Sequence, residues 1–166
     1  MIKMQLEDKI KRLENYLRNK KSVLGFSAGS DSTLIAYILS KVSPDSLLVT
    51  VNNNMMPDEF IEYTIKQAEK FNLKHKVINL DFLTDETFQN NGKQRCYECR
   101  KLMYFNIQQL PEFENYDYFL EGTNITDLLE DRPGILVLDM FNMTSPLVDC
   151  GITKQDVFDM TDYFNL

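Results

Sequence analysis

The sequence predicts an α/β fold in which one parallel sheet carries helices on both faces. Apolar runs of strand length alternate along the chain with longer segments that have helical spacing. Most of these runs are apolar throughout instead of alternating, as strands buried on both faces of a parallel sheet are. The chain has 166 residues, of which 43% are apolar. This is enough for a single domain over residues 1–166 with one hydrophobic core.

The first expected element is an amphipathic helix over residues 3–20, packed on the domain. Leu6, Ile10, Leu13 and Leu17 recur at intervals of three and four residues and therefore share one face. The segment is charged and has no apolar stretch of the kind found in a signal peptide. No run in the sequence approaches the roughly 20 apolar residues that span a bilayer. We therefore expect a cytoplasmic protein without a membrane partner.

The other elements follow in order, with turn residues between them. Pro57 suits the first turn of a helix, where its missing N–H group has no helical partner, and Thr153 suits a helix N-cap. The expected strands are Ser22–Phe26, Ser46–Asn52, Lys74–Leu80, Tyr116–Gly122 and approximately Thr144–Leu147. The expected helices are Ser32–Val42, Pro57–Phe71, Cys96–Leu110 and a segment that begins after Thr153.

The charge of the chain argues against general binding to nucleic acids. The formal net charge is −7 and the pI is about 4.7. Proteins that bind DNA or RNA through its phosphates need an excess of Lys and Arg on one surface. We therefore expect a small-molecule substrate, held by a local group of polar or basic residues.

The stretch between the first strand and the next helix contains no bulky side chain. Parallel sheets bind ligands at the carboxyl ends of their strands, which is where this stretch lies. Small residues let an anion approach backbone N–H groups, and the start of a helix adds unpaired donors and a positive dipole end. The stretch is therefore a candidate phosphate cradle, and the alternative is a capped turn without a ligand. Its residues are Ser27, Ala28, Gly29, Ser30, Asp31, Ser32 and Thr33.

Asp31 adds negative charge where phosphate is expected. Two roles fit it: it binds the Mg²⁺ that accompanies a nucleotide, or it caps the helix. Two further polar loops, Asn52–Pro57 and Gly122–Gly134, also follow expected strands. All three loops are therefore expected at the same edge of the sheet.

The stretch "GFSAGSDSTL" resembles the SGGxDS signature of the PP-loop ATP pyrophosphatases, with Ala28 at the second glycine. Two later stretches, "RCYECRKLMY" (Arg95–Tyr104) and "EGTNITDLLEDRPG" (Glu121–Gly134), resemble the LarE-type ATP-dependent sacrificial sulfur transferases of that superfamily. "SPLVDCGITKQDV" is similar to the segment after the fifth strand of that branch. The resemblance extends over most of the chain from Val23 to Leu166. It implies the Rossmann-like PP-loop (HUP) fold of the adenine nucleotide alpha hydrolase-like proteins.

The resemblance implies that the first loop binds the phosphates of ATP and that a substrate is adenylated with release of pyrophosphate. It places Val51 to Met55, where the second strand ends and its loop begins, beside the adenine. Residues of the first loop that match the family are Ser27, Gly29, Asp31, Ser32 and Thr33. Residues of the second loop that match are Gly122, Thr123, Asn124, Asp127 and Arg132.

Three of these residues have roles that their chemistry also supports. Asp31 and Asp127 are expected to hold Mg²⁺ through carboxylate oxygens. Asp31 and Arg132 are the expected catalytic residues, since Arg132 can bind a phosphate or a substrate carboxylate with two hydrogen bonds. Other readings remain open: a surface ion pair for Arg132, a surface carboxylate for Asp127, and a turn residue for Asn124.

The LarE-type proteins adenylate the carboxylate of a pyridinium mononucleotide and then deliver sulfur to it. They continue into a C-terminal portion that carries the sulfur-donating cysteine and arginines for the substrate phosphate, whereas this sequence ends at Leu166. We expect a homo-oligomer or a partner subunit to replace that portion. The alternatives are an ATP-binding module without catalysis, or another chemistry of the superfamily such as tRNA thiolation or amidation.

Cys96 and Cys99 form a CxxC pair one helical turn apart, so their side chains point the same way. Such a pair can bind an iron–sulfur cluster or zinc, act as a redox pair, or simply pack in a helix. The chain has three cysteines, so Cys150 is the remaining thiol for a cluster. We expect Cys150 to face away from the pair, because it follows the last strand by only a short turn.

Overall fold

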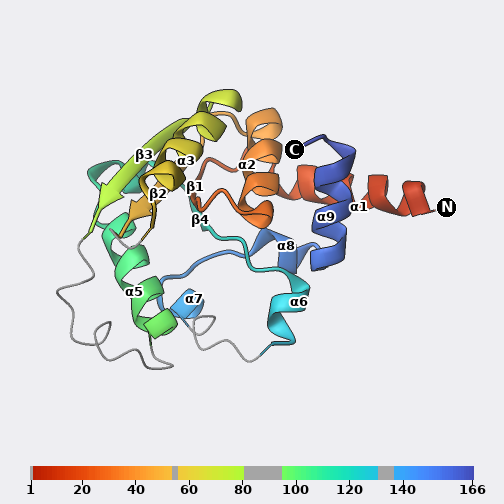
Figure 1. Cartoon of the computed structure of the whole chain (residues 1–166). Coiled ribbons are helices and arrows are strands. Elements are labelled where there is room, and N and C mark those ends of the chain that lie inside the picture. Colours follow the sequence, from red (N-terminus) through yellow and green to blue (C-terminus); the bar gives the residue numbers. More distant parts are fainter. Residues whose placement is uncertain (1, 54–55, 81–94, 131–136) are drawn as a thin grey trace.

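The structure is a computed structural model that describes residues 2–53, 56–80, 95–130 and 137–166 (Figure 1). Within these residues, four parallel strands form one sheet in the order β3-β2-β1-β4. They are β1 (Ser22–Gly25), β2 (Leu47–Asn52), β3 (Lys74–Asn79) and β4 (Tyr118–Leu120). The predicted fold class, a parallel sheet with helices on both faces, is confirmed.

The strand register aligns apolar residues across the sheet. Leu24 of β1 is paired with Leu48 of β2 and with Leu120 of β4, and all three side chains are fully buried. Because the strands are parallel, their carboxyl ends meet at one edge. The loops after β1 and β4 are therefore neighbours, although the residues that form them lie far apart in the sequence.

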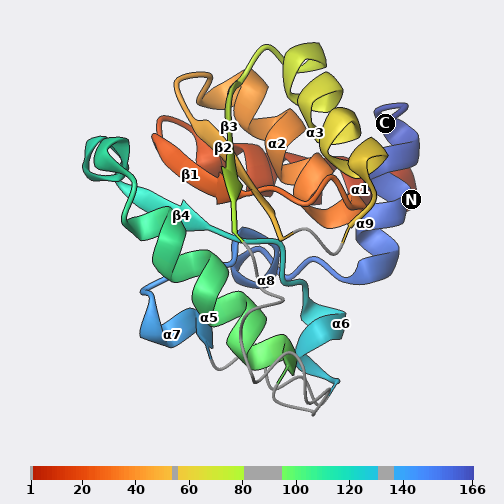
Figure 2. The same cartoon turned by 60° about the vertical axis from the view of Figure 1, so that its left-hand side comes forward.

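One face of the sheet is covered by helices from both ends of the chain (Figure 2). Here α1 packs on α2, α8 and α9, and α2 packs on β1 and α9. The core on this face includes Leu13 and Leu17 of α1, Leu34 of α2 and Val157 of α9. The helices are α1 (Ile2–Leu17), α2 (Ser30–Val42), α3 (Asp58–Lys70), α8 (Pro146–Asp149) and α9 (Lys154–Tyr163).

The other face is covered by α5, with the short helices η2 and α7 beside it (Figure 2). Tyr104 and Ile107 of α5 pack against Val23 of β1, Val49 of β2 and Phe119 of β4. The short helix α6 lies near α9, at the carboxyl edge of the sheet. These elements are α5 (Arg95–Gln108), η2 (Pro111–Asn115), α6 (Ile125–Leu128) and α7 (Val137–Met140).

The predicted fifth strand at Thr144–Leu147 is wrong in extent. Thr144 alone makes a parallel bridge to Leu120, and α8 begins at Pro146. Proline has no N–H to donate to a strand but suits the first turn of a helix, so the chain leaves the sheet there.

Local residues explain where α1 ends and where α9 begins. The helix α1 stops at Leu17, earlier than the predicted 20, because Asn19 takes the left-handed backbone conformation with φ of 60°. The predicted N-cap Thr153 is confirmed: its hydroxyl accepts from the N–H of Asp156, whose carboxylate accepts from the N–H of Thr153. This capping box fixes the start of α9.

Across the described ranges, none of the helices combines the length and the apolar character that crossing a membrane requires.

Candidate functional site

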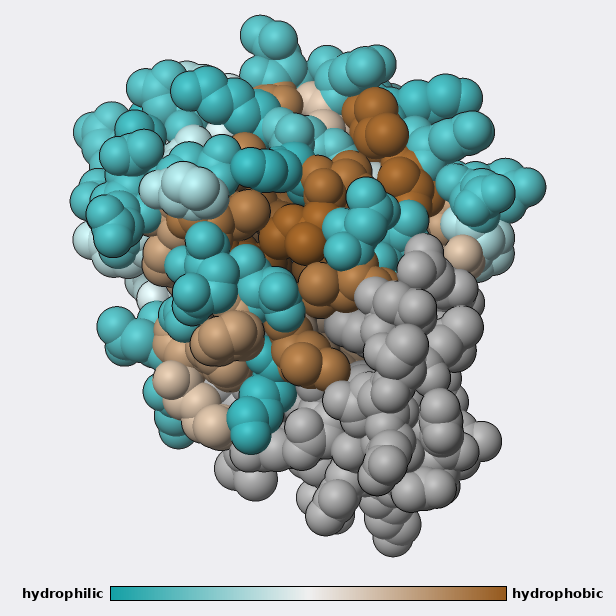
Figure 3. Space-filling view, turned by 90° about the vertical axis from the view of Figure 1, so that its left-hand side faces the viewer, coloured by the Kyte–Doolittle hydropathy of each residue, from teal (hydrophilic) through white to brown (hydrophobic). Residues whose placement is uncertain are grey.

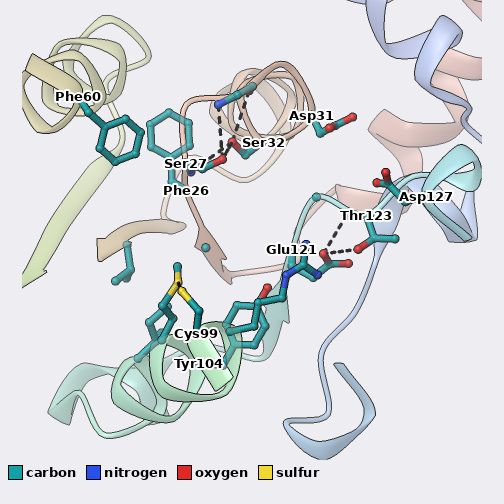
Figure 4. Close-up of a pocket in the computed structure, with 17 residues that line it drawn as sticks. Phe26, Ser27, Asp31, Ser32, Phe60, Cys99, Tyr104, Glu121, Thr123 and Asp127 are labelled. Atoms are coloured by element: carbon teal, nitrogen blue, oxygen red, sulfur yellow. Dashed lines mark hydrogen bonds between the residues drawn. The ribbon is translucent and has the colours of Figure 1, made fainter. Parts of the chain in front are cut away.

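A cavity of about 430 Å³ opens at the carboxyl edge of the sheet, between the β1–α2 loop, α5 and the loop after β4. Figure 4 shows Ser27, Ser32 and Asp31 on one side of it, Cys99 and Tyr104 of α5 on the opposite side, and Glu121 and Thr123 between them. Figure 3 shows apolar side chains gathered across the face that carries β3 and α5, with hydrophilic residues around them. Inside the cavity, the wall formed by the β1–α2 loop is polar and the wall formed by α5 is largely apolar, a combination that ligand sites commonly have.

The polar wall is built by the β1–α2 loop. The N–H of Phe26 donates to Val49 O at 2.8 Å, which continues the sheet to the start of the loop. Beyond it, the N–H of Ser27 donates to Ser32 Oγ at 3.3 Å, and the two serine hydroxyls also lie 3.3 Å apart. The loop thus folds back on the first turn of α2 with its hydroxyl groups at the cavity.

The N-terminus of α2 has an N-cap that leaves its donors available. Gly29 is the N-cap residue, and within the described residues no side chain caps the helix. Asp31 therefore does not cap α2, and the helix-cap role considered for it from the sequence is wrong. The first turn of this 13-residue helix, with its N–H groups and positive dipole end, lies at the cavity, which Gly29, Asp31 and Ser32 line.

Ala28 adopts φ of 60° inside this loop. The left-handed region costs a residue with a Cβ roughly 1–2 kcal/mol, and glycine occupies it freely. The chain therefore keeps the backbone shape that a glycine would provide at this position, at a cost in conformational energy.

Gly122 lets the loop after β4 approach α2 closely. A Cβ added at Gly122 would lie 3.2 Å from Asp31 Cβ and 3.5 Å from Ser32 N. A larger residue would have to push the two loops apart by a few tenths of an ångström. Gly122 is therefore the position that allows both polar loops to line one cavity.

Asp31 is held by two residues from distant parts of the chain. Lys154 Nζ lies 2.9 Å from Asp31 Oδ2, and Asn124 Nδ2 donates to Oδ1 at 3.0 Å. Lys154 also donates to Ser30 Oγ at 2.9 Å. An ammonium group is thus fixed beside the candidate phosphate cradle.

Asn124 and Asp127 shape the second loop. The Asn124 side chain accepts from the N–H of Asp127, and the Asp127 carboxylate accepts from the N–H of Asn124, which forms a capping box at the start of α6. Asn124 is fully buried and bonded to Asp31, so it is more than a turn residue. Asp127 lines the cavity, so it is not merely a carboxylate of the outer surface.

Glu121 is a buried carboxyl group at the base of the cavity, 4% exposed. It accepts hydrogen bonds from the N–H and the hydroxyl of Thr123 at 2.8 and 2.6 Å, and from the hydroxyl of Ser145. Burial raises the pKa of Glu121, although the hydrogen bonds from Ser145 and Thr123 and the charge of Arg100 oppose the increase. The sequence signal for this residue, an acidic side chain ending an apolar strand, could have identified it.

The apolar wall comes mainly from α5. Met103, Tyr104 and Ile107 line the cavity with Cys99 and Arg100, and Phe60 of α3 faces them. Burial raises the pKa of the Tyr104 phenol, so this hydroxyl stays protonated. The wall combines an aromatic and aliphatic surface with one guanidinium.

The structure brings most of the predicted site residues to this cavity. Val51 is buried in the sheet, and Val49 of the same strand lines the cavity. Other predicted residues that do not line the cavity are Ala28, Ser30, Thr33 and Asn124. Arg132 and the side chain of Cys96 lie outside the described residues. The predicted residues that line the cavity are Ser27, Gly29, Asp31, Ser32, Cys99, Gly122, Thr123 and Asp127.

Within the described residues, the polar wall of the cavity offers ligands for a hard cation. Asp31 and Asp127 offer carboxylate oxygens on the polar wall, which is the donor set that Mg²⁺ uses together with phosphate and water. In the part of the chain that the structure describes, no three acidic, histidine or cysteine side chains form a metal-binding group.

The third cysteine faces away from the site, as expected. Cys150 is buried in the core on the α1 side of the sheet, where its Sγ lies 3.9 Å from Arg12 O. Cys99 packs against the core on the opposite face, with its Sγ 3.7 Å from Met103 Sδ. Cys150 therefore cannot complete a cluster with Cys99.

A parallel sheet whose central strand leads through a hydroxyl-rich loop into a helix, with a second polar loop against it, defines a protein of the PP-loop ATP pyrophosphatase superfamily. More narrowly, the sequence model of the NAD synthase family matches residues 2–109, and the chain belongs to this family. The structure is similar to the NH3-dependent NAD synthetase of Campylobacter jejuni, with a TM-score of 0.68 and 16% identity, over 97% of this chain and 72% of that one.

The sequence relatives share more identical residues with this chain than the structural neighbour does. A protein of uncharacterised function from Methanocaldococcus jannaschii is 33% identical, over 93% of this chain and 59% of its own length. The pyridinium-3,5-bisthiocarboxylic acid mononucleotide synthase of Lactiplantibacillus plantarum is 26% identical, over 81% of this chain and 49% of its own length. The chain thus spans about half to three fifths of these curated relatives.

Proposed function

We propose that the protein binds ATP at the carboxyl edge of the sheet and uses it to adenylate a small substrate that carries a carboxylate or carbonyl group. The observation that carries this proposal is one cavity shared by the uncapped start of α2, the hydroxyls of Ser27 and Ser32, and the loop that follows Gly122. Its polar wall suits phosphates and its apolar wall suits a planar ring.

Each part of the polar wall has a task in this reaction. The first-turn N–H groups of α2 and the serine hydroxyls bind the pyrophosphate part of ATP, and Lys154 adds a positive charge beside them. Asp31 and Asp127 hold Mg²⁺, which offsets the phosphate charge. Asp31 must then exchange part of its contact with Lys154 for the cation.

The chemistry requires positioning more than acid–base catalysis. An oxygen of the substrate attacks the α-phosphorus, the bond between that phosphorus and the bridging oxygen breaks, and pyrophosphate leaves with the electron pair. Donors that are already fixed around the leaving group stabilise its developing charge without reorganisation. The α2 N-terminus and Lys154 are such donors.

We also propose that the acyl adenylate then accepts sulfur, with AMP as the leaving group. Support comes from the relative named as a bisthiocarboxylic acid mononucleotide synthase and from Cys99, whose side chain lines the cavity. Ammonia is the competing nucleophile, since the structural neighbour is an NH3-dependent synthetase. Both routes share the adenylate and differ only in the group that attacks it.

The test is pyrophosphate release from MgATP, measured with a panel of aromatic and pyridinium carboxylates. We expect release that depends on the carboxylate and that falls at least tenfold in Asp31→Asn. Asp159→Asn, which removes a carboxylate that does not line the cavity, is the control and should leave the rate unchanged. Mass spectrometry after addition of sulfide or ammonia identifies the second nucleophile. No pyrophosphate release with any carboxylate, despite tight ATP binding, would instead favour an ATP-binding module without catalysis.

A further inference from the structure

The guanidinium of Arg100 has a nitrogen that lacks a partner. Arg100 Nη1 is shielded from solvent and has no hydrogen-bond partner. Among the described residues, no other buried side-chain nitrogen or oxygen lacks a partner. Buried polar groups are nearly always bonded, because an unpaired one costs roughly 1–3 kcal/mol, and more if charged. Arg100 also lines the cavity. A ligand in the cavity would supply the missing hydrogen-bond acceptor once the side chains packed over Nη1 shift.

The surroundings of Arg100 select an anion with an apolar body. Met103, Tyr104 and Ile107 follow it along α5 and line the same cavity, and Phe60 faces them from α3. A guanidinium binds a carboxylate with two parallel hydrogen bonds, which fits a small planar acid better than a spherical ion.

Glu121 interacts with Arg100 through its charge but, within the described residues, makes no hydrogen bond to it. Glu121 already accepts three hydrogen bonds, from Thr123 and Ser145, and within the described residues it makes no salt bridge to Arg100. Burial raises the pKa of Glu121, and the charge of Arg100 opposes that increase. The guanidinium still has a hydrogen-bond donor left for a ligand carboxylate.

Arg100 also lies apart from the phosphate-binding wall. It belongs to α5, whose residues Cys99 and Tyr104 face Ser27 and Ser32 from across the cavity. A substrate held on α5 would thus meet the nucleotide from the side opposite the α2 N-terminus, as attack on the α-phosphorus requires.

We propose that Arg100 is the residue that recognises the carboxylate of the acceptor substrate, which lies against α5 when it is bound. The assignment of this ligand as the acceptor rests on the proposed adenylation, whereas the carboxylate site itself does not.

The probe is benzoate, with benzamide as its neutral counterpart of nearly the same shape. A ligand that binds the folded state raises the thermal unfolding midpoint of the full chain, by an amount that grows with the logarithm of its concentration relative to Kd. In the absence of ATP we expect benzoate to raise the midpoint and benzamide to have little effect. Arg100→Gln should weaken benzoate binding at least tenfold, and Arg100→Lys should recover part of it.

Two controls separate recognition from folding and from nucleotide binding. Lys101→Gln removes the next cation on α5, which does not line the cavity, and should bind benzoate as the wild type does. Without ligand, Arg100→Gln should unfold at or above the wild-type temperature, because it removes a guanidinium nitrogen that is shielded from solvent without a hydrogen-bond partner. Its affinity for MgATP should stay within twofold of the wild type.

The proposal is overturned if benzoate does not stabilise the wild type, if Arg100→Gln binds benzoate as well as the wild type, or if this variant loses MgATP affinity to the same extent. Failure of the proposed function looks different: the wild type would not bind MgATP, while benzoate would still bind in a manner that depends on Arg100.

Discussion

Lys154 Nζ lies 2.9 Å from Asp31 Oδ2, although 123 residues separate the two in the sequence. The contact joins the first turn of α9 to the first turn of α2 at the rim of the cavity. It fixes a positive charge beside the phosphate cradle and orients the carboxylate that we assign to Mg²⁺. The end of the described chain is therefore part of the candidate site.

Lys154→Gln should weaken MgATP binding at least tenfold, because it removes the ammonium beside the cradle. Stability should change by less than about 1 kcal/mol, since partly exposed ion pairs contribute little. Calorimetric titration and urea unfolding measure the two effects. The control is Lys9→Gln, which removes the pair with Asp156 at 2.8 Å, of similar exposure but away from the cavity. Equal ATP affinity in both variants would contradict the role of Lys154.

Ala28→Gly should raise the free energy of unfolding by about 1 kcal/mol or somewhat less. Ala28 has φ of 60°, where a Cβ is strained, and this gain exceeds the entropy that glycine loses on folding. Urea unfolding measures the change. Ala36→Gly, in the buried interior of α2, should destabilise instead, because a helix disfavours glycine by roughly 1 kcal/mol. If both substitutions destabilise the protein by a similar amount, the backbone of Ala28 is not strained by its left-handed conformation.

His75 should make the protein less stable as the pH falls below about 6.5. Thr50 Oγ1 donates to Phe26 O at 2.8 Å, so it must accept from Nε2–H of His75, also at 2.8 Å. Burial lowers the pKa of His75. The unfolded chain therefore binds the proton more strongly, and stability that is complete above the unfolded pKa is lost as the pH drops through the folded pKa.

His75→Gln keeps a donor for Thr50 and has no proton to gain in this range. The difference in unfolding free energy between wild type and His75→Gln should thus shrink or reverse from pH 7.5 to pH 5.5 in a urea series. A difference that stays constant with pH would show that His75 titrates alike in both states.

Glu121 should produce a pH effect of the opposite sign. Its folded pKa is raised by burial, so its contribution is complete below the unfolded pKa of about 4.5 and is lost as the pH rises through the folded pKa. In the same urea series, Glu121→Gln should become more stable relative to wild type as the pH increases. A relative stability that falls with increasing pH would mean that Glu121 is ionised in the folded protein at low pH.

The sequence predicted the sheet and its polar edge because both depend on local patterns. Apolar runs indicated β1 to β4, and small polar residues after β1 and β4 indicated the cavity that the structure contains. The fifth strand failed because proline at 146 outweighs the β-forming residues beside it. These are short-range effects that a sequence displays directly.

The remaining site residues depend on contacts that no local pattern records. Lys154 looks like an ordinary first-turn residue of α9 until the fold brings it to Asp31. Tyr104 and Phe60 look like core residues, and only the packing of α5 over the sheet and across from α3 makes them a cavity wall. Val49 and Val51 pack on the same face of the sheet, and only the packing of the helices on that face leaves Val49 beside the cavity.

The central claim is that ATP binds at the carboxyl edge of the sheet, and NMR titration of the ¹⁵N-labelled protein with MgATP tests it most directly. We expect the largest amide shifts in the β1–α2 loop from Ser27 to Thr33 and in the second loop from Gly122 to Asp127. The opposite edge provides the internal reference: Lys21, Lys74 and Glu112 line a separate polar hollow there and should shift little. Shifts concentrated at that hollow, or no shifts at saturating MgATP, would contradict the account.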